Sequence, residues 1–210
     1  MHTSSAVDDP LQACLPQWQF AETHHTDTTA SPEALLRAAQ AYDPVDDPLI
    51  GAALALREAP GRLAARLGWR SALAQRPRFG LADFTPLGQP TAHSLAYGLV
   101  GRFWEPGYGL VPQADAAAFA ACRAPGAARL LLGFVAQPLA AAVGGQPRTR
   151  LLTTTRVFCP DAATRRRLAP YWWLIRPVSG LIRQRMLGQI ARTAERAGQA
   201  GGPPPFSAPG

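Results

Sequence analysis

The sequence predicts an α+β protein whose helices gather on one face of an antiparallel sheet. Three observations lead to this class. An alternating segment precedes a run of short helical patterns, several strand-like segments then follow one another from residue 79 to residue 158, and one long helical segment closes the chain. Because strands that follow one another with short turns pair antiparallel, we expect a curved antiparallel sheet with the helices packed on one side.

The first elements are a strand and a short helix. Residues 18–27, WQFAETHHTD, alternate apolar and polar side chains, as a strand with one buried face does. Ser31 is suited to cap a helix that starts at Pro32, with Glu33 in its first turn. One or two further helical pieces are expected between residues 47 and 68, interrupted at Pro60 and Gly61.

The middle of the chain reads as strands. We expect strands at residues 79–87 and 93–104, joined by a turn at 88–90, and a short strand at 109–113. Asp115 can cap a brief helix, and residues 127–139 and 149–158 form the clearest hairpin, joined through Gly144 and Gly145.

The final segment is a long helix that begins after Asp161 and reaches about Ala197. Pro170, Pro177 and Gly180 predict a kink or two joined pieces. One face is expected to be buried and the arginines to remain in water; the buried face comprises Leu181, Ile182, Met186, Leu187, Ile190 and Ala194, and the opposite side Arg183, Arg185, Arg192 and Arg196.

Length and composition favour one domain. A chain of 210 residues with 47% hydrophobic content can bury a substantial core, so we expect a single domain at 15–197 between a disordered lead at 1–14 and a disordered Gly/Pro tail at 198–210. The net charge of +7 comes entirely from arginine, since there is no lysine. Acids dominate residues 1–60 and arginines dominate residues 148–197, so we expect the two ends to attract each other, and nucleic-acid binding is disfavoured.

The chain shows no membrane span and no export signal. Arg176, Arg183 and Arg185 interrupt the most apolar stretch, and each would cost roughly 2.5 to 3.5 kcal/mol near the centre of a bilayer. The first residues lack the basic and apolar regions of a signal peptide. Cys14, Cys122 and Cys159 form no metal-binding spacing, so we expect reduced thiols and a cytoplasmic protein.

Five segments carry a resemblance to a known superfamily: LPQWQF, SPEALLRAA, GLVGRFW, TRLLTTTRV and IRPVSGLIRQRMLGQI. In the order of their predicted elements and in their residue patterns, residues 15–197 resemble the START-like or Bet v 1-like superfamily, also called the polyketide cyclase/dehydrase and lipid transport family. The resemblance implies a helix-grip fold, in which the sheet wraps round the long final helix and encloses an apolar cavity. It also implies binding of a lipid or an aromatic, polyketide-like molecule. None of the five segments is a catalytic signature.

Strand parity predicts which residues would line such a cavity, because alternate side chains of a strand share a face. The expected lining is Tyr97, Leu99, Phe103, Leu130, Leu132, Phe134, Thr153, Thr155, Trp172, Leu181 and Met186. A filled core is the alternative for the same residues. Buried threonine hydroxyls favour a ligand, because without a partner each costs about 1 to 3 kcal/mol.

Two other functions remain open. A small cyclase or dehydratase could use the same cavity, and Glu22, His24, Asp83, Glu105 and Arg156 are the residues to test for acid-base work. No catalytic motif, metal site or cofactor site is indicated. Because Tyr171, Trp172 and Trp173 are consecutive on a helix, at least one ring faces away from the sheet, so a protein-interaction module is the second alternative.

Overall fold

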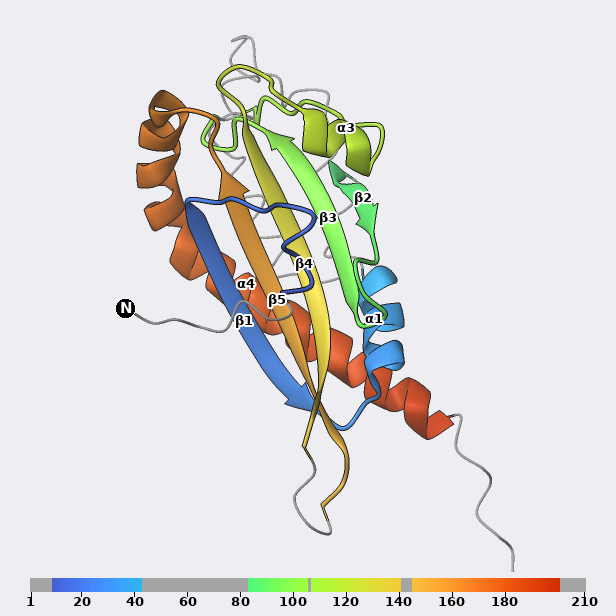
Figure 1. Cartoon of the computed structure of the whole chain (residues 1–210). Helices are drawn as coiled ribbons and strands as arrows, with labels where there is room; N and C mark the ends of the chain where they lie inside the picture. Colours follow the sequence, from blue (N-terminus) through green and yellow to red (C-terminus); the bar gives the residue numbers. More distant parts are fainter. Residues whose placement is uncertain (1–8, 43–82, 106, 141–144, 201–210) are drawn as a thin grey trace, which may run out of the picture.

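The structure, a computed structural model, describes residues 9–42, 83–105, 107–140 and 145–200. Its centre is a five-stranded antiparallel sheet with the strand order β1-β5-β4-β3-β2 (Figure 1). The strands are β1 (Phe20–Thr28), β2 (Thr85–Gly88), β3 (Ser94–Gly101), β4 (Ala128–Leu139) and β5 (Arg148–Phe158). The predicted α+β class, with an antiparallel sheet and a long final helix, is confirmed.

Three helices are described, and all three have the predicted caps. Helix α1 (Pro32–Gln40) starts where the Ala34 N–H donates to Ser31 Oγ at 3.2 Å. Helix α3 (Ala116–Ala121) starts where the Ala118 N–H donates to Asp115 Oδ1 at 2.7 Å. Helix α4 (Ala162–Ala200) starts where the Thr164 N–H donates to Asp161 Oδ1 at 2.7 Å. The predicted helical pieces between residues 47 and 68 lie outside the described residues. Residues 109–113, expected as a strand, make none; Val111 N–H donates one hydrogen bond to Val100, and Pro112 has no N–H to extend the ladder.

Helix α4 (Ala162–Ala200) runs without interruption through Pro170 and Pro177 and bends along its length (Figure 1). It lies across one face of the sheet together with α1, as predicted. No helix within the described ranges is long and apolar enough to cross a bilayer. Of the two alternatives expected from the prolines, a kinked helix or two joined pieces, the structure shows a single bent helix.

The buried face of α4 differs from the prediction at two positions. Met186, Leu187, Ile190 and Ala194 are buried as expected, but Leu181 is 61% exposed. At about 100° per residue, Leu181 is rotated roughly 140° from Met186 and faces away from the sheet. Arg183, expected in water, precedes Met186 by three residues and Ile190 by seven, which places it on the buried face instead.

The main core fills the layer between the sheet and the two helices. One cluster of buried side chains joins α1 and the second half of α4 to the sheet, through residues that include Leu35, Leu95, Phe134 and Ile190. A second cluster joins the first half of α4 to the other end of the sheet, through Leu99, Phe103, Val157, Leu168 and Trp172. Both lie on the side that strand parity assigned to the interior.

The other face of the sheet is covered by residues 9–15 and by α3. Leu11 is only 1% exposed and lies directly over Gly133, where a Cβ atom would come within 2.3 Å of Leu11 Cδ1. Phe119 of α3 contacts Gly98 in the same way. The expected disordered lead at 1–14 is therefore wrong for residues 9–14, while residues 1–8 and 201–210 lie outside the described part.

The acidic first part of the chain does attract the arginine-rich last part. Arg150 donates two hydrogen bonds to Asp27, from Nε at 2.7 Å and from Nη2 at 2.9 Å. Arg156 is paired with Asp9, and its guanidinium lies over the Trp18 ring. These pairs connect segments more than 100 residues apart in the sequence, as the charge distribution predicted.

Candidate functional site

Most of the predicted lining residues lie in the layer between the sheet and α4. Leu132, Phe134 and Met186 belong to one of its clusters, and Leu99, Phe103 and Trp172 belong to the other. Leu130 contacts both clusters. Tyr97 is half-buried with its ring edge toward Phe134, and this burial raises the pKa of its hydroxyl. Leu181 lies outside the layer, so its assignment to the lining is wrong.

Two polar members of the predicted set, Thr153 and Thr155, are buried in the same layer. They face inward on β5, the strand between β1 and β4, and their exposed fractions are 0% and 2%. Neither Oγ1 atom has a hydrogen-bond partner within the part of the chain that the structure describes. By contrast, the hydroxyl of Thr154, on the opposite face, lies 3.0 Å from that of Thr23. The layer therefore holds two hydroxyl groups that make no hydrogen bond to any described residue.

Glu22 and His24 stand beside these threonines on β1. The strand register places Glu22 opposite Thr155 and His24 opposite Thr153, and all four side chains point to the same face. His24 Nε2 is 2.9 Å from Glu22 Oε1, and the Glu22 side chain is only 9% exposed. The sequence suggested each residue separately for acid-base work, and the sheet brings them into hydrogen-bond contact.

Helix α4 places two arginines against this pair. Arg176 Nε lies 3.7 Å from Glu22 Oε1. Arg183 Nε donates to Ser179 Oγ at 3.1 Å, but its Nη1 is buried without a partner among the described residues. Burial lowers the pKa of Arg183 to about 10, against the opposing effect of the Glu22 carboxylate. Nothing in the sequence pattern distinguished this arginine from its exposed neighbours.

Gly180 allows the helix to come this close to β1. A Cβ atom at that position would lie 3.3 Å from His24 Cε1 and 3.7 Å from Glu22 Oε1. We define the polar cluster as Glu22, His24, Thr153, Thr155 and Arg183. It is bordered by the apolar side chains of Leu132 and Phe134, which the register places next to the two threonines.

The cluster combines three kinds of polar group that a small molecule could meet. The Arg183 Nη1 group, which bonds to no residue in the described ranges, offers a donor to an anionic or carbonyl oxygen. The threonine hydroxyls can donate or accept. A histidine held by a carboxylate can accept or give a proton. In the described ranges no three His, Cys, Asp or Glu side chains lie close enough together to hold a metal ion.

The other acid-base candidates lie away from the cluster. Arg156 is on the opposite face of the sheet, where it holds the N-terminal segment through Asp9. Glu105 lies in the loop after β3, with its Oε1 3.8 Å from Arg102 Nη1. Asp83 precedes β2, which is separated from β1 by the width of the sheet. The structure therefore brings together only two of the five.

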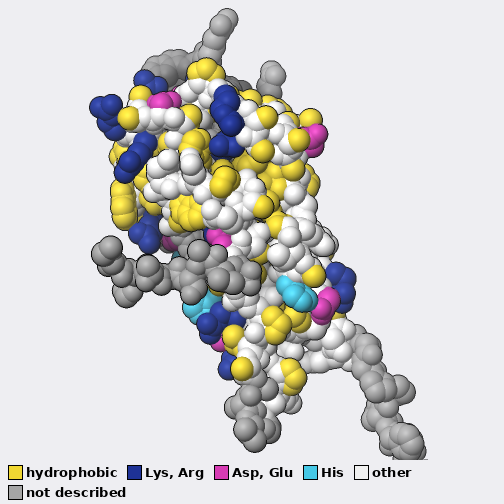
Figure 2. Space-filling model, viewed as in Figure 1, with side chains coloured by type: hydrophobic (Ala, Val, Ile, Leu, Met, Phe, Trp, Pro, Cys, Tyr) yellow, Lys and Arg dark blue, Asp and Glu magenta, His cyan; other side chains and the backbone are white. Residues whose placement is uncertain are grey.

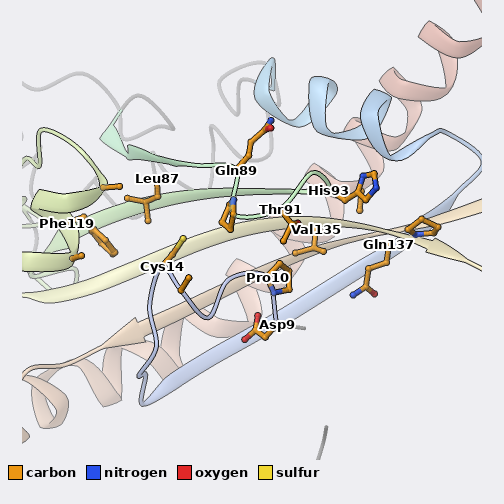
Figure 3. A pocket seen from close by; sticks show the side chains of 16 residues that line it. Asp9, Pro10, Cys14, Leu87, Gln89, Thr91, His93, Phe119, Val135 and Gln137 are labelled. Carbon is orange, nitrogen blue, oxygen red and sulfur yellow. The ribbon is translucent and has the colours of Figure 1, made fainter. Parts of the chain in front are cut away.

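A hollow that no sequence pattern predicted lies on the sheet face opposite α4. It has a volume of about 770 Å³ and lies between residues 9–14 and the β2–β3 connection; Figure 3 shows Pro10 and Cys14 on one side and Leu87, Gln89 and Thr91 on the other. None of the predicted lining residues reaches it, because their parity directs them to the other face. Burial also raises the pKa of Cys14, and the Asp9 carboxylate is already paired with Arg156.

A smaller hollow of about 440 Å³ lies between α1 and α4.

Comparisons with protein-family models, with curated proteins and with solved structures found no match to this chain.

Proposed function

We propose that this protein binds an amphipathic small molecule between its sheet and α4, with the polar end of the molecule at the polar cluster. The observation that carries this proposal is the pair of buried hydroxyls, Thr153 and Thr155, that lack partners within the described residues. A buried hydroxyl without a partner costs about 1 to 3 kcal/mol. Two such hydroxyls lie on one strand near an arginine N–H donor that also has no partner among the described residues. Together they support a ligand that supplies the missing hydrogen bonds.

The surroundings of the cluster suggest which ligand would fit. Its polar groups include one cation, Arg183, whose buried Nη1 atom suits a carboxylate or a polarised carbonyl. The adjoining side chains of Leu132, Phe134 and Met186 are apolar and suit a hydrocarbon or aromatic body. A fatty acid or an aromatic, polyketide-like acid combines both features. The START-like resemblance of the sequence suggests the same class of ligand.

The experiment is to recover the ligand. Purified protein is extracted with organic solvent, and the extract is compared by mass spectrometry with extracts of T153V/T155V and of T154V. Thr154 makes its hydrogen bond on the opposite face, so T154V controls for the loss of a strand hydroxyl. We expect one molecular species in the wild type and in T154V, and at least about ten-fold less of it in T153V/T155V. Native mass spectra without bound mass in any of the three would contradict the proposal.

A second candidate function, catalysis on the bound molecule, is favoured by the Glu22–His24 contact of 2.9 Å. A carboxylate that holds an imidazole by one nitrogen leaves the other nitrogen for proton transfer. If the site is catalytic, H24Q binds the molecule but does not convert it, so the mass recovered from H24Q differs from the mass recovered from the wild type. Identical masses would leave binding as the function and remove catalysis.

A further inference from the structure

An apolar stripe runs along the solvent side of α4. We define this apolar stripe as Trp173, Leu174, Val178 and Leu181, whose exposed fractions are 63%, 78%, 42% and 61%. Trp173, Leu174 and Leu181 are more than half exposed although each is among the largest apolar residue types. At about 100° per residue, the stripe centres on the side of the helix opposite the buried Trp172 and Ile190. The sheet therefore cannot cover it.

Arginines accompany the apolar stripe, and acids are absent from this part of the sequence. Exposed Arg165, Arg166 and Arg167 lie in the helical turns before it, and the Arg176 guanidinium lies 5.4 Å from the centre of the Trp173 ring. No Asp or Glu occurs from residue 162 to residue 194. Figure 2 shows arginine and hydrophobic side chains next to one another at the upper left, over the first half of α4.

This combination of chemistry selects among possible partners. A second copy meeting the same face by two-fold symmetry would bring arginines against arginines, which is unfavourable. A nucleic acid would use the arginines and leave Leu174, Val178 and Leu181 in water. An anionic lipid surface meets both requirements, because its headgroups attract arginine and its acyl boundary receives leucine and tryptophan side chains.

We infer that the first half of α4 docks this protein on membrane surfaces that carry anionic lipids. The helix lies in the plane of the interface, with the apolar stripe directed into the headgroup and acyl boundary. Arg166 and Arg167, which a rotation of about 100° per residue places on the side of the stripe, contact the phosphates, and Trp173 lies at the level of the headgroups. This inference does not depend on the ligand site, because that site is on the opposite side of the helix.

Vesicle sedimentation tests the inference. The full chain is mixed with vesicles of phosphatidylcholine alone, or of phosphatidylcholine with about 30% phosphatidylglycerol, at low salt. Each arginine near an anionic surface contributes about a five-fold increase in affinity, so we expect at least ten-fold tighter binding to the anionic vesicles. The triple variant R165Q/R166Q/R167Q should lose that preference. The matched variant R148Q/R192Q/R196Q, which removes three exposed arginines elsewhere, should keep most of it.

The apolar stripe is tested separately by L174Q/L181Q. Both side chains are exposed, so circular dichroism and urea unfolding should match the wild type while binding to anionic vesicles falls about ten-fold or more. Failure of the wild type to sediment with anionic vesicles overturns the inference, as does undiminished binding by L174Q/L181Q. A dimer that L174Q/L181Q converts to a monomer, in a protein that ignores vesicles, would assign the stripe to a second copy instead.

Discussion

Replacing Thr153 and Thr155 with valine should stabilise the ligand-free protein. Valine has nearly the same shape as threonine but carries no hydroxyl, so the double substitution removes two buried polar groups without opening a cavity. Both side chains are essentially fully buried, and neither hydroxyl has a partner among the described residues. A substitution that usually destabilises a core is therefore expected here to do the opposite.

The magnitude follows from the cost of an unpaired hydroxyl. At about 1 kcal/mol for each site, the low end of the range, T153V/T155V should gain about 2 kcal/mol in the free energy of unfolding. For a chain of this size that gain raises the melting temperature by about 4 to 8 °C. The measurement is urea unfolding of protein stripped of bound small molecules by refolding from denaturant.

Thr154 supplies the control. Its hydroxyl contacts that of Thr23, so T154V removes one hydrogen bond and should lower stability by about 0.5 to 1.5 kcal/mol. Opposite signs for T153V/T155V and T154V support the assignment of unused hydroxyls. A loss of stability in the ligand-free T153V/T155V protein would refute the reasoning, because it would mean that the hydroxyls are satisfied without a ligand.

Three further predictions concern other parts of the fold. G133A should lower the free energy of unfolding by about 1 to 3 kcal/mol, because the added Cβ atom would clash with Leu11. Urea unfolding should show a smaller loss when the same substitution is made in an L11A background. Equal losses in the two backgrounds would contradict the close contact. R156M should increase hydrogen exchange in residues 9–18, since Arg156 holds Asp9 and covers Trp18; unchanged exchange would show that Leu11 alone holds the segment. Burial raises the pKa of Cys159 to about 11, so its thiol should react with iodoacetamide at pH 8 roughly a hundred-fold more slowly than an ordinary thiol. The unfolded thiol ionises near pH 9, so the stability contributed by this group should fall between pH 9 and pH 11, and C159V should not show that part of the decline.

The elements could be predicted because local chemistry determines them. Ser31 and Asp115 cap helices by bonding their own following N–H groups, and such contacts need only neighbouring residues. The inward orientation of Thr153 and Thr155 follows from strand parity, which is fixed once the strand is recognised. Trp172 and Trp173 were expected to diverge, and the helix buries the first and exposes the second.

The site could be predicted only in part, because its partners meet through the tertiary structure. Glu22 and His24 are two residues apart, yet their nearness to Arg183 depends on where α4 crosses β1. Leu11 carries no periodic signal, since it lies in a short polar segment whose partner, Gly133, has no side chain. The hollow under residues 9–14 joins four distant segments, at residues 9–14, 87–93, 116–120 and 135–138, and has no sequence pattern of its own.

The pairing of β1 with β5 has a consequence for how the chain folds. Among the described strands, β1 lies at the edge of the sheet and pairs with β5, which ends at residue 158; the Thr23–Thr154 contact spans 131 residues. During synthesis β1 therefore cannot pair with β5 until residue 158 has left the ribosome. Long-range pairing of this kind slows folding and leaves strand edges open to association, so nascent chains that stall before β5 should be the most prone to aggregate.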